Sequence, residues 1–304
     1  MDSPQRRAAP TAVDLVMLLG VGALWGASFL FIRVAVPDLR PVALIEARVL
    51  LAGLALLAVV AGLHRVPAWR TDWRSYLLLG GLSAAAPFTL IAAAELHLTA
   101  SLAAILNATT PLFALLLGAL RLRVPLAPRR LAGVLLGLLG VAVLVGLGPL
   151  HLDATLLLAA AASLLAALLF AVGGVYAGTR FAGVAPITVA TGQQLGAAAL
   201  LLLPTLLLPP AQAPSAPVGA AVLSLALACT ALGFVLFYRP LARLGPTRAL
   251  SVTFLVPVFR LAWGALFLGE TITSATVVGL LLVLTAVALV TEVTPSQRNI
   301  TATR

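Results

Sequence analysis

A single arginine, Arg260, stands deep inside an apolar stretch, with nine or more uncharged residues on either side. Arginine stays protonated in proteins, so Arg260 cannot lower the cost of burial by losing its proton. Its guanidinium group therefore needs an acceptor, water or an anion. Two interpretations stay open. One is a fixed ion pair with Glu46, Glu95 or Glu270, or a bond to backbone carbonyls freed by Pro257. The other is a site that holds the carboxylate of a solute.

Four more ionisable residues lie at the ends of apolar stretches. Glu46 and Arg48 are two residues apart, so on a helix they point to different sides and do not pair with each other. Both lie near one membrane face, where a long side chain can reach polar surroundings. Glu95 closes one stretch at the same face. Glu270 opens the last stretch, where an acid near a helix N-terminus is favourable.

Three prolines, Pro87, Pro111 and Pro257, interrupt apolar stretches and are predicted hinges. A proline removes one backbone hydrogen bond, and the freed carbonyl needs another partner. Broken helices of this kind often line a binding site, although a tolerated kink is the alternative. Hydroxyl and amide side chains precede two of the prolines, where they could bind a solute or join helices. These polar residues are Asn107, Thr109, Thr110, Ser251 and Thr253.

Aromatic rings are spread over several of the same stretches. Amphipathic rings suit organic solutes in a pathway, and a position facing lipid is the alternative. The predicted solute-binding residues are Trp25, Phe29, Phe88, Asn107, Thr110, Tyr176, Phe234, Thr253, Arg260 and Trp263.

The elements that carry these residues are long apolar helices. Hydrophobic residues make up 62% of the 304 residues and charged residues 9%, against roughly a quarter charged residues in a soluble domain. A helix that crosses a membrane needs about 20 mostly apolar residues. Ten stretches qualify, which predicts an all-α integral membrane protein embedded in a lipid bilayer. They lie at 13–35, 41–63, 75–95, 98–120, 130–148, 153–178, 184–208, 217–238, 246–268 and 271–292.

The arginines predict the orientation of these helices. With the N-terminus inside, fourteen arginines fall in inner segments and one, Arg40, in an outer loop. Positive residues favour the cytoplasmic side, so both termini are predicted to be cytoplasmic, in a bacterial inner membrane. The arginines lie in short gaps between apolar stretches and form no basic face, which argues against a nucleic-acid partner.

The chain also repeats itself. A shift of 146 residues places Phe88 on Phe234, Pro111 on Pro257 and Gly118 on Gly264. Two copies of five helices follow, and because five is odd the second copy enters the membrane inverted. The predicted repeats are 13–148 and 153–292, with tails at 1–12 and 293–304. The arginine-rich gap 121–130 corresponds to a gap at 267–276 that holds no arginine, as expected for inverted copies.

The sequence is similar to the EamA-type permeases of the drug/metabolite transporter superfamily. The resemblance rests on Leu24-Trp25-Gly26-Ala27-Ser28-Phe29, on Arg48-Val49-Leu50-Leu51-Ala52-Gly53, on Pro257-Val258-Phe259 and on Leu266-Phe267-Leu268-Gly269-Glu270. It implies a secondary transporter for an amino-acid-like solute or a drug, working by alternating access as an exporter. Two positions depart from the family pattern. Val124 aligns with Glu270, and Arg260 replaces a small residue.

Two other classes of protein were weighed against transport. A membrane-embedded enzyme needs clustered nucleophiles, acids or metal ligands. The sequence holds no such cluster, so neither enzyme activity nor a cofactor or metal is expected. A structural or partner-binding membrane subunit is the remaining alternative. Gly133, Gly137 and Gly140 suit close packing, either within the chain or between two copies in a homodimer.

Overall fold

The computed structural model describes residues 11–122, 127–146, 153–210, 213–244 and 252–291. The predicted tail 293–304 and most of the tail 1–12 lie outside these ranges. Within the described residues every element is a helix. The first half contains α1 (Ala12–Gly62), α2 (Trp69–Gly80), η1 (Gly81–Ala85), α3 (Ala86–Ala94), α4 (Ala100–Asn107), α5 (Thr110–Leu122) and α6 (Pro128–Gly146).

The second half contains α7 (Ala154–Arg180), α8 (Pro186–Leu207), α9 (Ala216–Leu223), η2 (Ser224–Leu232), α10 (Gly233–Leu244), α12 (Val252–Phe267) and α13 (Ser274–Thr291). Six helices or continuous runs of helices in the described residues are long and apolar enough to cross a membrane. The structure therefore bears out an all-helical membrane protein.

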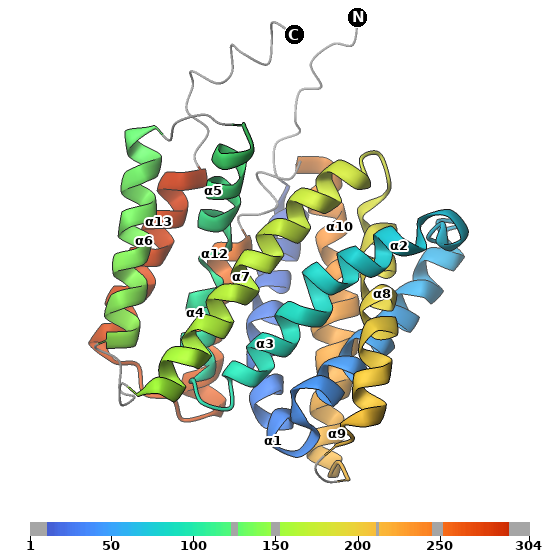
Figure 1. Cartoon of the computed structure of the whole chain (residues 1–304), viewed down its shortest axis with the longest axis horizontal. Helices are drawn as coiled ribbons and strands as arrows, with labels where there is room; N and C mark the ends of the chain where they lie inside the picture. Colours follow the sequence, from blue (N-terminus) through green and yellow to red (C-terminus); the bar gives the residue numbers. More distant parts are fainter. Residues whose placement is uncertain (1–10, 123–126, 147–152, 211–212, 245–251, 292–304) are drawn as a thin grey trace, which may run out of the picture.

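The first two predicted helices, 13–35 and 41–63, form one element in the structure. Thr11 and Asp14 start α1 with a capping box, in which each side chain bonds the other residue's backbone N–H. Its 51 residues, at about 1.5 Å per residue, exceed twice the roughly 30 Å of a bilayer's hydrocarbon core. The helix breaks at Arg40, which has φ 61° and ψ 157° and lies between Pro37 and Pro41. Figure 1 shows the two arms of α1 running in different directions.

The two halves share a local irregularity. Helix α2 continues into α3 through the π-helical turn η1, and α9 continues into α10 through the π-helical turn η2. Shifted by 146 residues, the range 81–85 becomes 227–231, which lies inside η2. A π-helical turn inside an α-helix is uncommon and is frequent at functional sites. The same irregularity at equivalent positions supports a structural repeat.

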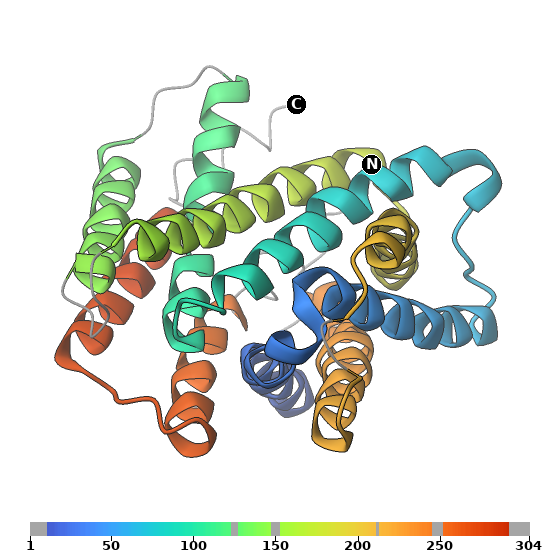
Figure 2. The ribbon, with the colours of Figure 1, turned by 60° about the horizontal axis from the view of Figure 1, so that its bottom comes forward.

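Contacts between the halves also come in matched sets. Helix α1 contacts α12, and the equivalent pair with the halves exchanged, α7 and α4, is also in contact. Likewise α2 contacts α8, and the equivalent pair, η2 and α1, is in contact. Helices α6 and α13, each the last of its half, pack against each other. Figures 1 and 2 both show them side by side at one end of the molecule. Exchange of the two halves thus preserves the contact pattern.

Small residues allow the halves to approach closely. A Cβ atom at Gly26 of α1 would lie 2.9 Å from the Cβ of Phe259 on α12, so a larger residue there would push the two helices apart. A Cβ atom at Gly140 of α6 would lie 2.9 Å from Val283 of α13. A Cβ atom at Gly137 would meet Leu112 of α5, in the same half, and would lie 3.4 Å from Ala286 of α13. Packing within the chain therefore accounts for these two glycines, without a second copy.

Candidate functional site

Arg48 lies at the contact between the two halves. It belongs to the second arm of α1, and 5% of the residue is exposed. Its Nε donates to Thr230 Oγ1 in η2 at 3.0 Å, and its Cζ lies 3.8 Å from the ring centre of Phe88 on α3. The sequence predicted that Arg48 lies near a membrane face, where its side chain can reach polar surroundings. In the structure the side chain instead turns inward to a hydroxyl and an aromatic face.

The guanidinium group of Arg48 is incompletely bonded. In the described part of the chain no acceptor bonds its Nη1 or Nη2 atoms, and its single hydrogen bond is the one from Nε. Thr230, which accepts that bond, itself donates to the carbonyl of Leu225 in the π-helical turn, at 2.8 Å. The extra residue in η2 thus positions a hydroxyl for Arg48. Two charged donor groups remain available to an acceptor at this point.

The other π-helical turn, η1, also accepts a hydrogen bond from a side chain of the opposite half. Gln193 of α8 donates through Nε2 to the carbonyl of Ser83 in η1, at 3.1 Å. Pro87, four residues after Ser83, has no N–H to offer that carbonyl, so the amide of Gln193 replaces the lost partner. Each π-helical turn is therefore contacted by a polar side chain from the other half, Arg48 in one case and Gln193 in the other.

Arg260 forms an ion pair with Glu270. The side chain of Arg260 is fully buried, and its Nη2 lies 3.1 Å from Glu270 Oε1. The geometry favours the first of the two interpretations, a fixed ion pair. The pairing is incomplete, because Arg260 Nε and Nη1 are buried without a hydrogen-bond partner among the described residues. Arg260 therefore keeps two donors that Glu270 does not use.

Glu270 stabilises the start of a helix in the other half. Its carboxylate accepts hydrogen bonds from the backbone N–H groups of Ala100 and Ser101, at 2.9 and 3.3 Å, and from the hydroxyl of Ser101. The expectation that Glu270 caps the final helix is wrong. Thr273 caps α13, and the turn at Gly269, with φ 63°, directs Glu270 toward α4. An acid at a helix N-terminus is favourable, here across the boundary between the halves.

Glu95 lies beside this ion pair, just beyond the apolar span Trp69–Ala94. Both of its carboxyl oxygens are buried, and within the described residues neither accepts a hydrogen bond. Arg33 donates to the backbone carbonyl of Glu95 rather than to its carboxylate.

The predicted aromatic residues separate into several groups. Phe88 covers Arg48 and contacts Phe170. Trp25 packs against Phe234 and Phe237. Phe29 is buried in the main core, and Trp263 donates to the backbone carbonyl of Ala23. Tyr176 belongs to a separate cluster that also contains Trp69, Tyr76 and Phe181. Phe88 is the predicted ring that lies against a charged group in the described residues, the guanidinium group of Arg48.

The hydroxyl groups beside Pro111 have structural partners, but within the described residues the side-chain oxygen of Asn107 does not. Helix α4 ends at Asn107 and α5 begins at Thr110, so Pro111 divides the predicted helix 98–120. The carbonyl of Asn107, which Pro111 cannot bond, accepts from the Thr110 hydroxyl at 2.8 Å. Asn107 Oδ1 is buried without a partner among the described residues. Near Pro257, Ser251 and the side chain of Thr253 lie outside the described part.

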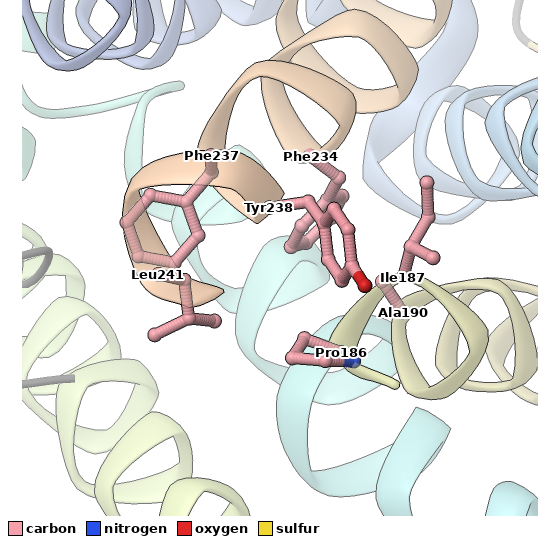
Figure 3. Close-up of a pocket in the computed structure, with 7 residues that line it drawn as sticks. All are labelled: Pro186, Ile187, Ala190, Phe234, Phe237, Tyr238 and Leu241. Atoms are coloured by element: carbon pink, nitrogen blue, oxygen red, sulfur yellow. The ribbon is translucent and has the colours of Figure 1, made fainter. Parts of the chain in front are cut away.

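A small apolar pocket lies elsewhere, between α8 and α10 of the second half. Figure 3 shows Pro186, Ile187 and Ala190 of α8 facing four residues of α10, which are Phe234, Phe237, Tyr238 and Leu241. Phe234 is the one predicted binding residue that lines it. The pocket offers no charged group and does not lie between the halves. We therefore place the candidate site at Arg48 and the neighbouring charges.

Residues that the sequence did not single out complete this site. Thr230 and Gln193 carry no distinctive motif, and their importance follows from the π-helical turns, which hydropathy does not reveal. Ser101 matters because Glu270 reaches it across the boundary between halves. One signal was present in the sequence: Arg48, Glu95, Arg260 and Glu270 are ionisable residues in a chain with 9% charged residues. Their convergence required the fold.

The helices, the shared π-helical turns and the buried charges between matched halves define a membrane-spanning protein built from a structural repeat. The chain belongs to the EamA-like transporter family, which matches residues 13–146 and 157–292. The resemblance predicted from the sequence motifs is thereby confirmed. Because members of this family are transporters and not enzymes, the chain is a membrane transport protein.

A solved structure described as "Crystal structure of protein" has the same fold. It gives a TM-score of 0.65 at 22% sequence identity, covering 96% of this chain and 99% of that chain. At this identity the likeness concerns the fold alone. Comparison with curated proteins gives no match.

Proposed function

We propose that the chain is a permease that exports a small organic solute across the bacterial cytoplasmic membrane by alternating access. The solute is an amino-acid-like metabolite or a drug, and it carries a carboxylate. Arg48 is the residue that binds this group. The observation behind the proposal is that Arg48 is buried between the halves with Nη1 and Nη2 unbonded in the described structure. A buried guanidinium group favours a planar anion that accepts two parallel bonds.

We further propose ten membrane crossings, arranged as inverted repeats at 13–148 and 153–292, with both termini cytoplasmic. The length of α1 and its break at Arg40 support two crossings by this helix. The equivalent π-helical turns and the matched contacts support the repeat. A site between two repeats suits alternating access, because rocking of one half against the other exposes it to each face in turn.

Flux in proteoliposomes tests this function. The purified protein is reconstituted, and exchange of radiolabelled leucine, threonine, glutamate and lactate is followed. We expect at least one of these solutes to exchange above empty liposomes. Arg48→Gln should reduce that flux about tenfold or more, because a hydrogen bond to a charged group contributes about 1.5–3 kcal/mol. Arg48→Lys should recover part of it.

A matched control uses Arg65, whose Nη1 bonds Tyr238 on an exposed surface. Arg65→Gln removes the same charge outside the proposed site and should leave the flux within twofold of the original. Equal losses in Arg48→Gln and Arg65→Gln would contradict the proposed site. No flux of any carboxylate or amino acid would contradict the proposed function.

A further inference from the structure

The carboxylate of Glu270 lies among donors that come from both halves. In the first half, α4 supplies the backbone N–H groups of Ala100 and Ser101, at 2.9 and 3.3 Å, and the hydroxyl of Ser101. In the second half, α12 supplies Arg260 Nη2 at 3.1 Å. A carboxylate at this point therefore has hydrogen-bond donors from two helices that contact each other across the boundary between the halves.

The start of α4 does not depend on Glu270 for its ordinary cap. Thr99 caps the helix, because its Oγ1 accepts from the backbone N–H of Leu102 at 3.1 Å. The first two N–H groups of the helix, those of Ala100 and Ser101, point past this cap and need an acceptor from elsewhere. Glu270 provides it from 170 residues further along the chain. The first turn of α4 is thus open to an anion from outside the helix.

Two further features fit this place to a carboxylate. Arg260 is fully buried, and its Nε and Nη1 have no partner within the described residues, so it offers more donors than Glu270 uses. Gly264, one turn further along α12, leaves room for the anion. A Cβ atom at Gly264 would lie 2.5 Å from Glu270 Oε2 and 3.0 Å from Ser101 Oγ. The carboxylate therefore occupies a space that the missing side chain provides.

Glu270 is placed so that it can leave. It lies in the loop between α12 and α13, after the turn at Gly269, and its side chain is 13% exposed whereas that of Arg260 is 0% exposed. In the proposed topology this loop faces the outer side. When the halves separate there, α4 and the loop move apart, because they belong to different halves. Arg260 stays charged, so its donors then need another anion.

We propose that these donors form a second carboxylate site, at the outer side, which Glu270 fills when that side is closed and the solute fills when it is open. This inference rests on the proposed function, which supplies a solute with a carboxylate. In export, the solute's carboxylate takes the place of Glu270 on Arg260 and α4. The return of Glu270 then expels the solute and closes the outer side. The chain's own carboxylate is thus a competitor of the solute.

Acetate tests whether the site binds a free carboxylate. Glu270→Ala lacks a CH2–COO⁻ group, for which acetate is the free equivalent. The unfolding midpoint of the full chain in detergent is measured with increasing acetate and with the same concentrations of chloride. Acetate should raise the midpoint of Glu270→Ala by about a few degrees more than that of the unaltered protein, because a ligand of the folded state stabilises it. Arg48 is present in both proteins, so the difference belongs to this site. Acetamide, which has no charge, should have no such effect.

Two glycines give a matched pair of variants. In the Glu270→Ala protein, Gly264→Ala places a methyl group in the space of the carboxylate and should abolish the effect of acetate. Gly118→Ala, at the equivalent position of the first half, should keep it, because a Cβ atom there meets nothing within 4 Å. If Glu270→Ala does not fold, Glu270→Gln replaces it. Its amide still holds α4 but carries no charge, so acetate should displace it and raise the midpoint by a smaller amount.

Displacement tests whether the solute uses the same donors. Saturation transfer to the methyl signal of acetate, followed by NMR, reports acetate bound to Glu270→Ala. Arg48→Gln is added so that acetate bound at Arg48 does not contribute. Whichever of leucine, threonine, glutamate and lactate is exchanged in proteoliposomes should abolish the signal. The carboxamide of the same solute should leave the signal unchanged.

The inference is overturned if acetate stabilises Glu270→Ala no more than the unaltered protein, if Gly264→Ala keeps the effect, or if the exchanged solute does not displace acetate. The proposed function fails separately. Exchange of a solute with the expected loss in Arg48→Gln, but without acetate binding to Glu270→Ala, leaves the permease and removes the outer site. If no solute is exchanged, the proposed function is contradicted, and the outer site loses its solute with it.

Discussion

At Arg260 the cost of burying a charge is offset by an acid from the loop that follows its own helix. Glu270 lies ten residues further on, and the turn at Gly269 returns it to within 3.1 Å of the guanidinium group. The same carboxylate holds the start of α4. A single acid thus balances a buried cation and joins the two halves, so its loss should disturb both.

The ion pair makes a prediction about stability. Arg260→Ala leaves the Glu270 carboxylate without its cation, and breaking a buried pair in this way costs about 3–5 kcal/mol. The midpoint of thermal unfolding in detergent, followed by tryptophan fluorescence, should fall clearly. Arg260→Ala with Glu270→Gln should recover part of the loss, because the amide oxygen can still accept from Ala100 or Ser101. A double variant less stable than Arg260→Ala would contradict the pairing.

At the scale of elements, two prolines, Pro87 and Pro111, remove helical hydrogen bonds without leaving the freed carbonyls unbonded. The carbonyl freed by Pro111 bonds the Thr110 hydroxyl, and the one freed by Pro87 bonds Gln193 from α8. The hydrogen bond from Thr110 lies within one half, and the hydrogen bond from Gln193 joins the two halves. A bond between the halves can break and form again when the halves move, whereas a bond within one half keeps the interrupted helix together.

The local repair can be tested at Thr110. Thr110→Val keeps the shape of the side chain but removes the donor to the Asn107 carbonyl. A buried acceptor left unbonded costs about 1–3 kcal/mol. Because this bond is partly buried, we expect the lower end of that range and a fall of the unfolding midpoint by a few degrees. Thr110→Ser keeps the hydroxyl and serves as the control. A valine variant as stable as the serine variant would show that the bond contributes nothing.

The helices were largely predictable from hydropathy, but the contacts between them were not. Each predicted apolar stretch contains a helix of the structure, because about 20 apolar residues are stable only in a membrane or a core. Helix α2 begins at Trp69, six residues before the predicted apolar stretch. Hydropathy could not predict the π-helical turns, because it does not distinguish them from α-helix. Arg48 was misplaced because its partner, Thr230, lies 182 residues away and no local rule relates the two.

At the scale of the whole molecule, the arginine distribution predicts which side each end occupies. A protease site and tag placed at either terminus should resist protease added to intact cells and be cleaved in inside-out vesicles. The reason is that positive residues beside membrane helices are retained in the cytoplasm. Cleavage of either tag in intact cells would invert the proposed orientation. A tag inserted at the break of α1 around Arg40 is the control and should be cleaved from outside.

The two halves are held together on both sides of the candidate site. Toward the N-terminal end of α1, Asp14 lies 3.0 Å from Arg243 and 3.8 Å from Arg239, both on α10. Toward the other side, Glu270 joins the loop before α13 to α4. A permease that alternates must break one of these connections at a time. The single cysteine, Cys229, lies fully buried in η2 between them, next to Thr230.

Cys229 can therefore report the opening of the inner side. Asp14→Asn keeps a side-chain oxygen to cap α1 but removes the charge that holds Arg239 and Arg243. Since partly exposed ion pairs contribute about 0.2–1 kcal/mol, the inward-open state should gain about 1.4- to fivefold in population. Labelling of Cys229 by a charged maleimide in inside-out vesicles should accelerate by the same factor. Asp153→Asn, at the cap of α7, is the matched control and should not change the rate, while Cys229→Ala gives the background. If Asp14→Asn folds normally and labels no faster than Asp153→Asn, the inner ion pairs do not govern access to the site.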